Sequence, residues 1–206
     1  VGPAGEEIFT DTYGRIKVQF HWDREGERNE YSSCWLRVAQ AWAGEGWGFL
    51  FIPRIGMEVV VQFLDGDPDR PFVAQCLYNA THLPPVTLPG QKTHSVIRSQ
   101  SVPGTGAKSQ NGFNELSFED GDGQEEVYLH AQRNQREKVL NDHLVEVDHD
   151  ETETVLNDQT HTVGRHRTTK VRGNEVHSVT GDSEAEGAGE VGNRTTKIAD
   201  NDSTEV

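Results

Sequence analysis

The sequence predicts an all-β protein, in which a small antiparallel barrel is followed by an intertwined three-chain β-helix, or needle. Two observations support this fold class. Residues 13–78 are rich in Trp, Phe, Val, Ile and Leu and show no helical period. Residues 139–206 contain no Phe, Trp or Tyr, yet a valine returns at every eighth position from Val139 to Val179. The first segment can therefore build an ordinary core, whereas the second cannot.

Residues 1–80 are expected to form the barrel, because short runs with strand chemistry alternate there with polar turns. In the first run Ile16, Val18, Phe20 and Trp22 share one face, which is the pattern of a half-buried strand. The turns between the runs are rich in Gly, Asp and Glu. The four runs expected as strands are Arg15–Trp22, Cys34–Trp42, Met57–Leu64 and Phe72–Tyr78.

Small barrels of this kind often bind oligonucleotides or oligosaccharides through stacked aromatic side chains beside basic residues. Aromatic side chains are present at Trp22, Trp35, Trp42 and Trp47, but basic partners are few. The net charge of −15 also repels nucleic-acid phosphates and anionic lipid heads. We therefore expect no nucleic-acid partner, and we expect the tryptophans to fill the barrel and its interfaces.

The two cysteines, Cys34 and Cys76, lie in apolar runs and are expected to be buried thiols rather than a disulfide. Neither cysteine is part of a CxxC pair or of a metal-ligand spacing. Apolar runs of the roughly 20 residues needed for a membrane span are absent from the sequence. The sequence predicts no cofactor and no metal site.

Several long motifs resemble the valine-glycine repeat protein G (VgrG) family. These proteins are the spikes of type VI secretion systems and are related to the cell-puncturing needle of contractile phages. The motifs are GRIKVQFHWDREG (14–26), SSCWLRVAQAWAGEGWG (32–48), FIPRIGMEVVVQFLDGDPDRP (51–71) and NGFNELSFEDGDGQEEVYLHAQRN (111–134). The resemblance implies an OB-like barrel followed by a trimeric β-helix.

Residues 81–112 are rich in Pro, Gly, Ser and Thr and are expected to be an extended connector. The phage relative carries a lysozyme domain at this place, for which the connector leaves no room. His94, Ser95 and Ser99 are expected to be ordinary polar loop residues. The string GTGAKS (104–109) fails the spacing of a phosphate-binding loop, because Ala107 separates the glycine from the lysine.

The string EDGDGQEE (119–126) resembles a calcium loop but lacks its ligand set, since the twelfth residue from Asp120 is Ala131 rather than Glu. A hairpin turn explains it better. Leu116 and Phe118 precede the turn and Val127 and Leu129 follow it, each pair spaced by two residues.

Residues 113–206 are expected to form the trimeric β-helix, with its eight-residue repeat clearest over 139–181. Eight is an even number, so in an extended chain every repeat valine points to the same side. In an α-helix the same spacing would carry the valines around the surface. The predicted axial residues are Val139, Val147, Val155, Val163, Val171 and Val179.

The position two residues after each valine is expected to be a corner in the left-handed conformation, which Gly and Asn adopt most readily. The corner residues that suit it are Asn141, Asn157, Gly173 and Gly181, while His149 and Arg165 are exceptions. The repeat is therefore interpreted as a short strand, a corner and another strand.

Energetics favour three chains over one. A buried valine contributes roughly 1.5 to 2 kcal/mol, whereas ordering the eight residues of its repeat costs about 1 to 2 kcal/mol per residue for the backbone alone. In a three-chain prism, three valines meet in each layer and backbone groups pair between chains, so that no sheet edge is left. The predicted assembly is therefore a homotrimer with a thin valine axis and a polar surface.

The residue two positions before each valine is expected to share its face. These residues are Val145, Glu153, His161, Thr169 and His177. Three imidazoles at His161 or His177 could bind a metal or an anion. The simpler alternative is a set of polar groups bonded to water or threonine, so no metal site is assigned.

The period is lost after Val179 and returns at Ile198 and Val206, so residues 183–192 are expected to be a loop or an irregular insertion. The sequence opens without Met and ends while the repeat is still running. It is therefore expected to be a piece of a longer protein, in which more β-helix follows.

The resemblance implies a mechanical function rather than an enzymatic one, namely a membrane-puncturing spike that delivers effectors. The implied partners are a secretion tube ring protein, a PAAR-type tip protein and effector proteins. The spike would be assembled in the bacterial cytoplasm and then secreted, crossing the target membrane mechanically. The alternative is a trimeric fibre or carbohydrate-binding adhesin, which would need an exposed aromatic patch on the barrel. No catalytic residue is predicted.

Overall fold

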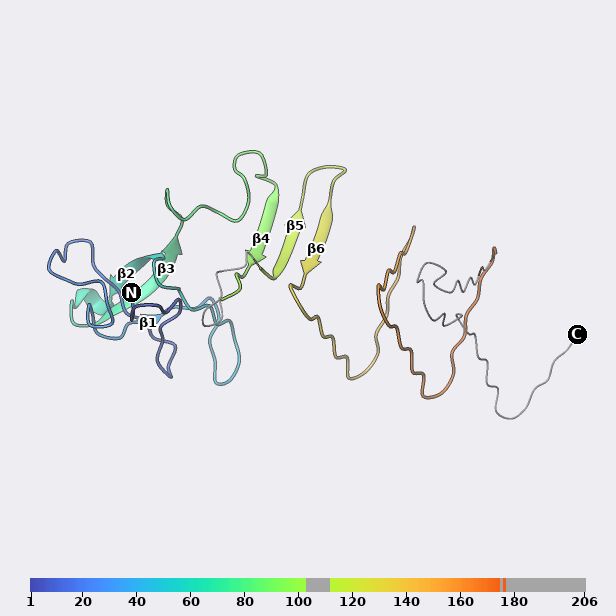
Figure 1. Cartoon of the computed structure of the whole chain (residues 1–206), viewed down its shortest axis with the longest axis horizontal. Helices are drawn as coiled ribbons and strands as arrows, with labels where there is room; N and C mark the ends of the chain where they lie inside the picture. The colour runs from blue at the N-terminus through green and yellow to red at the C-terminus, as the bar shows by residue number, and fades with distance from the viewer. Residues whose placement is uncertain (103–111, 175, 177–206) are drawn as a thin grey trace, which may run out of the picture. The chain divides into compact units, whose positions relative to one another are not determined.

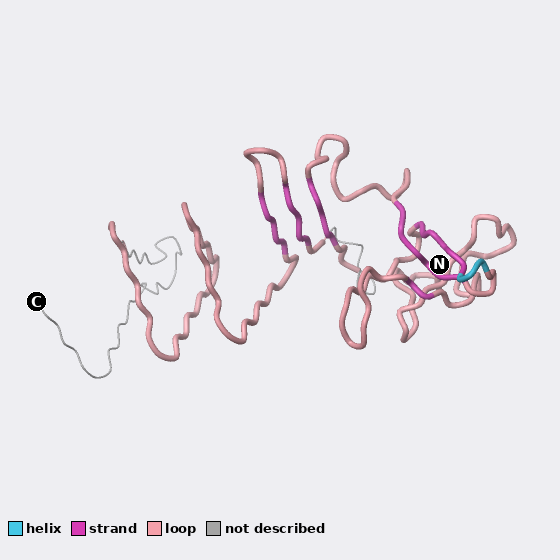
Figure 2. Tube along the Cα trace, turned by 180° about the vertical axis from the view of Figure 1, so that it is seen from behind, coloured by secondary structure: helices cyan, strands magenta, loops and turns pink. Residues whose placement is uncertain are grey.

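The computed structural model describes residues 1–102, 112–174 and 176. The chain divides into two units, Val1–Asn141 and Asp142–Val206. In the described residues the structure is β-strands and irregular chain, with a single 3₁₀ turn at Leu64–Gly66 (Figure 1). The strands form two separate groups, both within the first unit (Figure 2).

The first sheet belongs to the barrel and has the strand order β1-β3-β2. Its strands are β1 (Arg37–Val38), β2 (Glu58–Phe63) and β3 (Pro71–Leu77). β2 and β3 confirm two of the predicted strands, and they pair antiparallel with an irregularity between Val60 and Val61. β1 departs from the antiparallel expectation because it lies parallel to β3.

The core of the barrel is small. Ile16, Val18, Leu36 and Val73 are buried. Partly buried hydrophobic side chains, including Phe20, pack around these four residues. The inward face predicted from the alternation at 16, 18 and 20 is therefore correct, but Trp22 on the same predicted face is exposed.

Two predicted strands are much shorter than expected because side chains replace the backbone ladder. Ile16 and Leu36 exchange backbone hydrogen bonds of 2.9 and 2.8 Å. At the next inward position, however, the Val18 amide donates to Ser33 Oγ at 2.9 Å. The Gln19 side chain then bonds to Asp23. The segment 15–22 therefore makes only one bridge, and it ends in a turn at residues 21–22, where the Asp23 amide donates to the Phe20 carbonyl at 3.1 Å.

The structure corrects two expectations about burial in the barrel. Cys34 and Cys76 are free thiols, as expected, but both are exposed rather than buried. On β3, Cys76 lies opposite Val59 near the end of the strand, away from the buried Val73. Three of the four tryptophans do not fill the barrel either, since Trp22, Trp42 and Trp47 are exposed. Trp35 is half-buried and packs against Phe9.

Residues 40–51 form a projecting loop, here named the aromatic arm. Ala43 and Gly48 pair as an isolated antiparallel bridge within it. The side chain of Gln40 joins its two ends through the backbone of Phe51, with distances of 3.0 and 3.1 Å. The arm is therefore a small hairpin whose two ends are joined where it leaves the barrel.

The second sheet has the order β4-β5-β6 and is antiparallel throughout. Its strands are β4 (His94–Arg98), β5 (Glu115–Glu119) and β6 (Glu126–His130). The hairpin expected at 119–126 is confirmed by the pairs Phe118–Val127 and Leu116–Leu129. β4 lies inside the segment 81–112, so part of the expected extended connector, from His94 to Arg98, is a paired strand.

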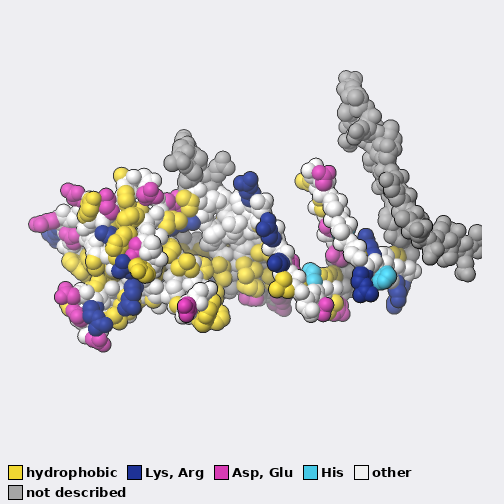
Figure 3. Space-filling model, turned by 90° about the horizontal axis from the view of Figure 1, so that it is seen from below, with side chains coloured by type: hydrophobic (Ala, Val, Ile, Leu, Met, Phe, Trp, Pro, Cys, Tyr) yellow, Lys and Arg dark blue, Asp and Glu magenta, His cyan; other side chains and the backbone are white. Residues whose placement is uncertain are grey.

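The second unit contains no strand or helix among its described residues, 142–174 and 176. Its chain is extended and follows a winding path (Figure 1). Polar and charged side chains predominate on it, whereas hydrophobic side chains gather on the surface of the first unit (Figure 3). A single copy of this segment therefore has no core of its own.

Candidate trimer interface

The predicted axial valines share one environment in the single chain. Val139, Val147, Val155, Val163 and Val171 are between 45% and 52% exposed. The apolar side chains Leu140, Leu144 and Leu156, which lie off the repeat, are between 86% and 99% exposed. Equal partial burial at each eighth residue indicates regular winding and leaves half of each valine surface available. Val179 lies outside the described residues, and the axial position of the set stays a prediction.

The chain bends at fixed intervals. The bends fall at 132–133, 140–141, 148–149, 156–157, 164–165 and 172–173. Each bend after the first directly follows a repeat valine. The first follows Ala131, so the structural period begins one repeat before the valine pattern shows it.

The predicted corner residues Asn141, Asn157 and Gly173 are each the second residue of a bend. Gly181 lies outside the described residues. The expected left-handed conformation is wrong for the described corners, because none of them is among the residues with positive φ. Backbone with negative φ suits every residue type. This explains why His149 and Arg165 occupy equivalent bends.

The sheet β4-β5-β6 presents an apolar face that the sequence interpretation assigned only to a hairpin. Cross-strand pairing places Ile97, Leu116 and Leu129 in one row. Ser95, Phe118 and Val127 form the next row on the same face. Leu116 is half-buried, and the other apolar members are 39–69% exposed: Ile97, Phe118, Val127 and Leu129. The period-2 alternation of these residues is the signal from which this second surface could have been found.

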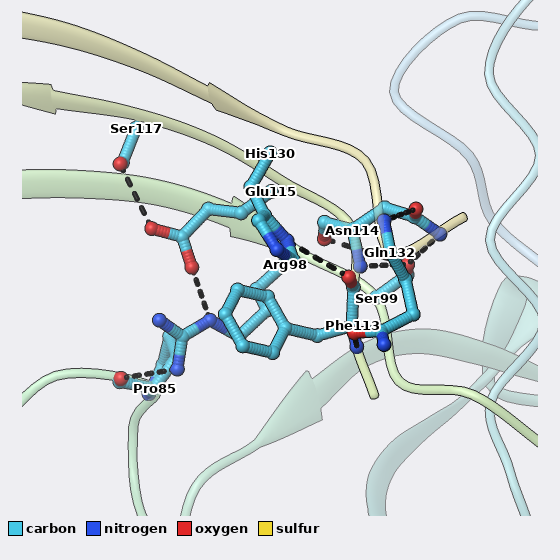
Figure 4. A network of polar contacts seen from close by, with 9 residues as sticks. All are labelled: Pro85, Arg98, Ser99, Phe113, Asn114, Glu115, Ser117, His130 and Gln132. Carbon is cyan, nitrogen blue, oxygen red and sulfur yellow. Dashed lines mark hydrogen bonds and ion pairs between the residues drawn. The ribbon is translucent and has the colours of Figure 1, made fainter. Parts of the chain in front are cut away.

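The opposite face of the same sheet is polar and more buried. Glu115 and Ser117 are 8% and 6% exposed. Glu115 accepts from Ser117 Oγ at 2.8 Å and pairs with Arg98 (Figure 4). Arg98 also donates to the Pro85 carbonyl at 3.1 Å. The chain therefore buries this polar face along β5, whereas the apolar face is left without a cover on all three strands.

Aromatic side chains complete this polar network. The Arg98 guanidinium lies 4.4 Å from the centre of the Phe113 ring. His130 Nδ1 donates to the Phe113 carbonyl at 3.1 Å, since a carbonyl oxygen can only accept. Desolvation raises the pKa of Glu115, but hydrogen bonds from Arg98 and Ser117 and the nearby positive charge bring it below its ordinary value.

A second pair of side chains lies at the other end of the polar face. His94 Nε2 lies 2.5 Å from a carboxylate oxygen of Glu119. The hydrogen bond from Thr93 is the main cause that lowers the pKa of Glu119, and the Gly121 amide and His94 add to it. His94 lies in β4, so it is not the loop residue that the sequence predicted. Ser95 is also on β4, and Ser99 directly follows it and exchanges hydrogen bonds with Asn114.

The part of the chain that the structure describes contains no cluster of three His, Cys, Asp or Glu side chains able to hold a metal ion. His161 lies in this part, whereas His177 and the string GTGAKS lie outside it. Among residues 1–102, 112–174 and 176, no helix has the length and apolar character of a membrane span.

Comparison with known families matches both sheets and the repeat. Residues 9–78 match the type VI secretion system/phage-baseplate injector OB domain. Residues 95–206 match the bacteriophage T4 gp5 C-terminal trimerisation domain. The second match starts at Ser95, the second residue of β4, and so begins earlier than the expected boundary at residue 113.

Curated relatives agree with these families. The type VI secretion system spike protein VgrG4b of Pseudomonas aeruginosa is 53% identical over 149 residues, which are 72% of this chain and 18% of that protein. VgrG1c of the same organism is 53% identical over 152 residues, covering 74% and 20%. The actin cross-linking toxin VgrG1 of Vibrio cholerae is 51% identical over 151 residues, covering 73% and 13%.

The chain thus spans about a fifth or less of the length of these relatives. The fold is all-β, with an OB-like barrel and a trimeric β-helix. The chain belongs to the gp5 C-terminal trimerisation domain family, and its OB domain and sequence identity place it among the VgrG spike proteins of type VI secretion systems.

Proposed function

We propose that three copies of this chain wind into a rigid rod that serves as the puncturing spike of a type VI secretion apparatus. The observation that carries the proposal is the equal half-exposure of the repeat valines at each eighth residue, within a segment that matches a trimerisation domain. Each copy also presents the uncovered apolar face of β4-β5-β6. Three copies would bury both surfaces together.

Such a rod suits mechanical work. Intertwined chains must unwind together, so resistance to unfolding is a property of the unfolding rate rather than of a large stability per residue. Three copies carry three times the charge of −15, which keeps an ejected rod soluble. We assign this segment a structural role. The toxin activity in the name of the Vibrio cholerae relative is not assigned to this segment.

The same proposal includes partners and location. The rod would stand on a tube of ring proteins, carry a PAAR-type tip protein and deliver effector proteins into a target cell. It would be assembled in the bacterial cytoplasm and then secreted. The names of the relatives, which are spike proteins of this secretion system, support this proposal.

The mass of the particle in solution tests the proposed assembly. Light scattering is expected to give three times the chain mass of 23.0 kDa. A folded particle of one chain mass would overturn the proposal. Secretion tests the function, because the protein should appear outside the cell only when the secretion system is active. Secretion that does not depend on the system would contradict the spike role.

The alternative of a carbohydrate-binding fibre is favoured by one observation, which is the exposed aromatic arm on the barrel. Saccharide sites, however, combine aromatic faces with several hydrogen-bonding side chains. Apart from Gln40 and Glu45, the arm consists of apolar residues and glycine, so it offers few such groups. A glycan array decides between the two, since binding that is lost in a Trp42→Ser variant would support the fibre function.

A further inference from the structure

The aromatic arm is an exposed apolar surface outside the segment that matches the trimerisation domain. Every residue from 41 to 51 is exposed. Its large apolar side chains are 51–72% exposed: Trp42, Trp47, Phe49, Leu50 and Phe51. Contiguous apolar patches of more than a few hundred Å² are rare on monomers and mark interaction sites. An arm of this composition therefore needs a partner surface.

The arm is ordered before any partner binds. The Gly44 amide donates to the Trp47 carbonyl at 2.9 Å, and the Phe49 amide donates to the Trp42 carbonyl at 2.8 Å. The rings of Trp42 and Trp47 meet edge to face at 5.1 Å. A preformed hairpin with packed rings loses little conformational entropy on binding. This makes the arm suitable for a fixed contact.

The chemistry of the arm points to an apolar protein partner. Glu45 is its single charged residue, so phosphates and anionic lipid heads gain nothing from it. Aromatic side chains with few charges are typical of the central part of a protein interface.

The base of the arm is tied to the trimerisation segment. Three residues after Phe51, Arg54 Nη2 donates to the Gln100 carbonyl at 2.5 Å. Arg54 also pairs with Glu7 at 2.6 Å. Gln100 lies within the matched segment 95–206. The chain that follows the arm is therefore bonded to the segment that matches a trimerisation domain, and a second copy is the partner that this segment supplies.

We propose that the aromatic arm packs against a neighbouring copy of this chain and extends the trimer contact into the OB domain. This proposal rests on the proposed trimer. It adds a contact at residues 40–51 that the trimerisation family match does not include.

Hydroxyl-radical footprinting of the full chain, followed by mass spectrometry, tests this contact. Tyr31 is an internal reference because it is 81% exposed and lies outside the arm. After correction for intrinsic reactivity, Trp47 and Phe49 are expected to react several-fold more slowly than Tyr31 in the trimer. Equal reaction in a particle of three chain masses would overturn the arm contact alone. A particle of one chain mass would overturn the proposed assembly and the contact with it.

A pair of variants adds an independent readout. Trp47→Ser with Phe49→Ser removes exposed rings that do not belong to the barrel core, so the barrel should still fold. Its trimer is expected to dissociate at a lower guanidinium concentration than wild type, whereas Tyr31→Ser should not change the midpoint. An unchanged midpoint in the arm variant, or protection that appears only after saccharide is added, would contradict the proposal.

Discussion

At the scale of single residues, Glu115 shows how the second sheet holds its polar face. Its carboxylate is almost fully buried between Arg98 and Ser117. Although desolvation acts in the opposite direction, these hydrogen bonds keep the pKa of Glu115 below its ordinary value. A carboxyl group whose pKa is lowered in the folded state stabilises that state at pH values above the pKa of the unfolded chain. That contribution is lost as the pH falls through the folded value.

We expect Glu115→Gln to lower the free energy of unfolding by about 1 kcal/mol near neutral pH, because Arg98 loses a charged acceptor. The difference from wild type should shrink as the pH falls below the ordinary range of a glutamate. Chemical unfolding of the full chain across this pH range measures both effects. Glu125→Gln is the control, since Glu125 is exposed in the hairpin turn. A difference that stays constant with pH would contradict the assigned ion pair.

At the scale of elements, the bends of the repeat and the turn of the hairpin make a matched glycine pair. Gly123 has φ +73° and Gly173 has no positive φ, and an added Cβ meets nothing within 4 Å at either position. Gly123→Ala should therefore lower the free energy of unfolding by about 1 to 2 kcal/mol. Gly173→Ala should be neutral, or stabilising by about 0.4 to 1 kcal/mol. If denaturant unfolding showed an equal loss of unfolding free energy in both variants, Gly173 would have to adopt the left-handed conformation that the sequence predicted.

The two faces of β6 make a second matched pair. We expect Leu129→Lys to prevent assembly, because it places a charge on the apolar face that three copies would cover. Tyr128→Lys changes the neighbouring residue, which lies on the opposite face, and should leave the assembly intact. Light scattering of the two variants distinguishes the faces. A trimer of Leu129→Lys would show that this face is not part of the interface.

The elements also show what could be predicted from the sequence. The largely apolar runs 57–64 and 72–78 predicted β2 and β3 to within one residue at each end, and the spacing around the hairpin predicted the pairing of β5 with β6. Side-chain bonds such as Val18 to Ser33 carry no periodic signal, so the loss of the first strand was not predictable. β4 was missed because Pro, Gly and Ser around it conceal a short alternation. The exposure of Cys34 and Cys76 depends on strand direction and position, which composition does not encode.

At the scale of the whole molecule, a single copy satisfies its polar groups better than its apolar ones. The polar face of the second sheet is buried along β5, while the apolar face, the repeat valines and the aromatic arm are largely uncovered. All three surfaces require partners, and an identical chain can cover them without any additional protein. Because closed point groups are the usual symmetry of soluble homo-oligomers, one threefold assembly is the simplest arrangement that covers them together.

The adjacent residues Val155 and Leu156 test this assembly most directly. They are 45% and 99% exposed in the single chain, so only the first is expected to face the axis. Val155→Asp would bring three like charges together on the axis and should stop assembly, as should Val163→Asp. Leu156→Asp introduces the same charge on the outer surface and should assemble as wild type does. Light scattering of the three variants gives the answer, because a stable trimer of Val155→Asp, or loss of the trimer in Leu156→Asp, would reverse the inward and outward assignment of the entire repeat.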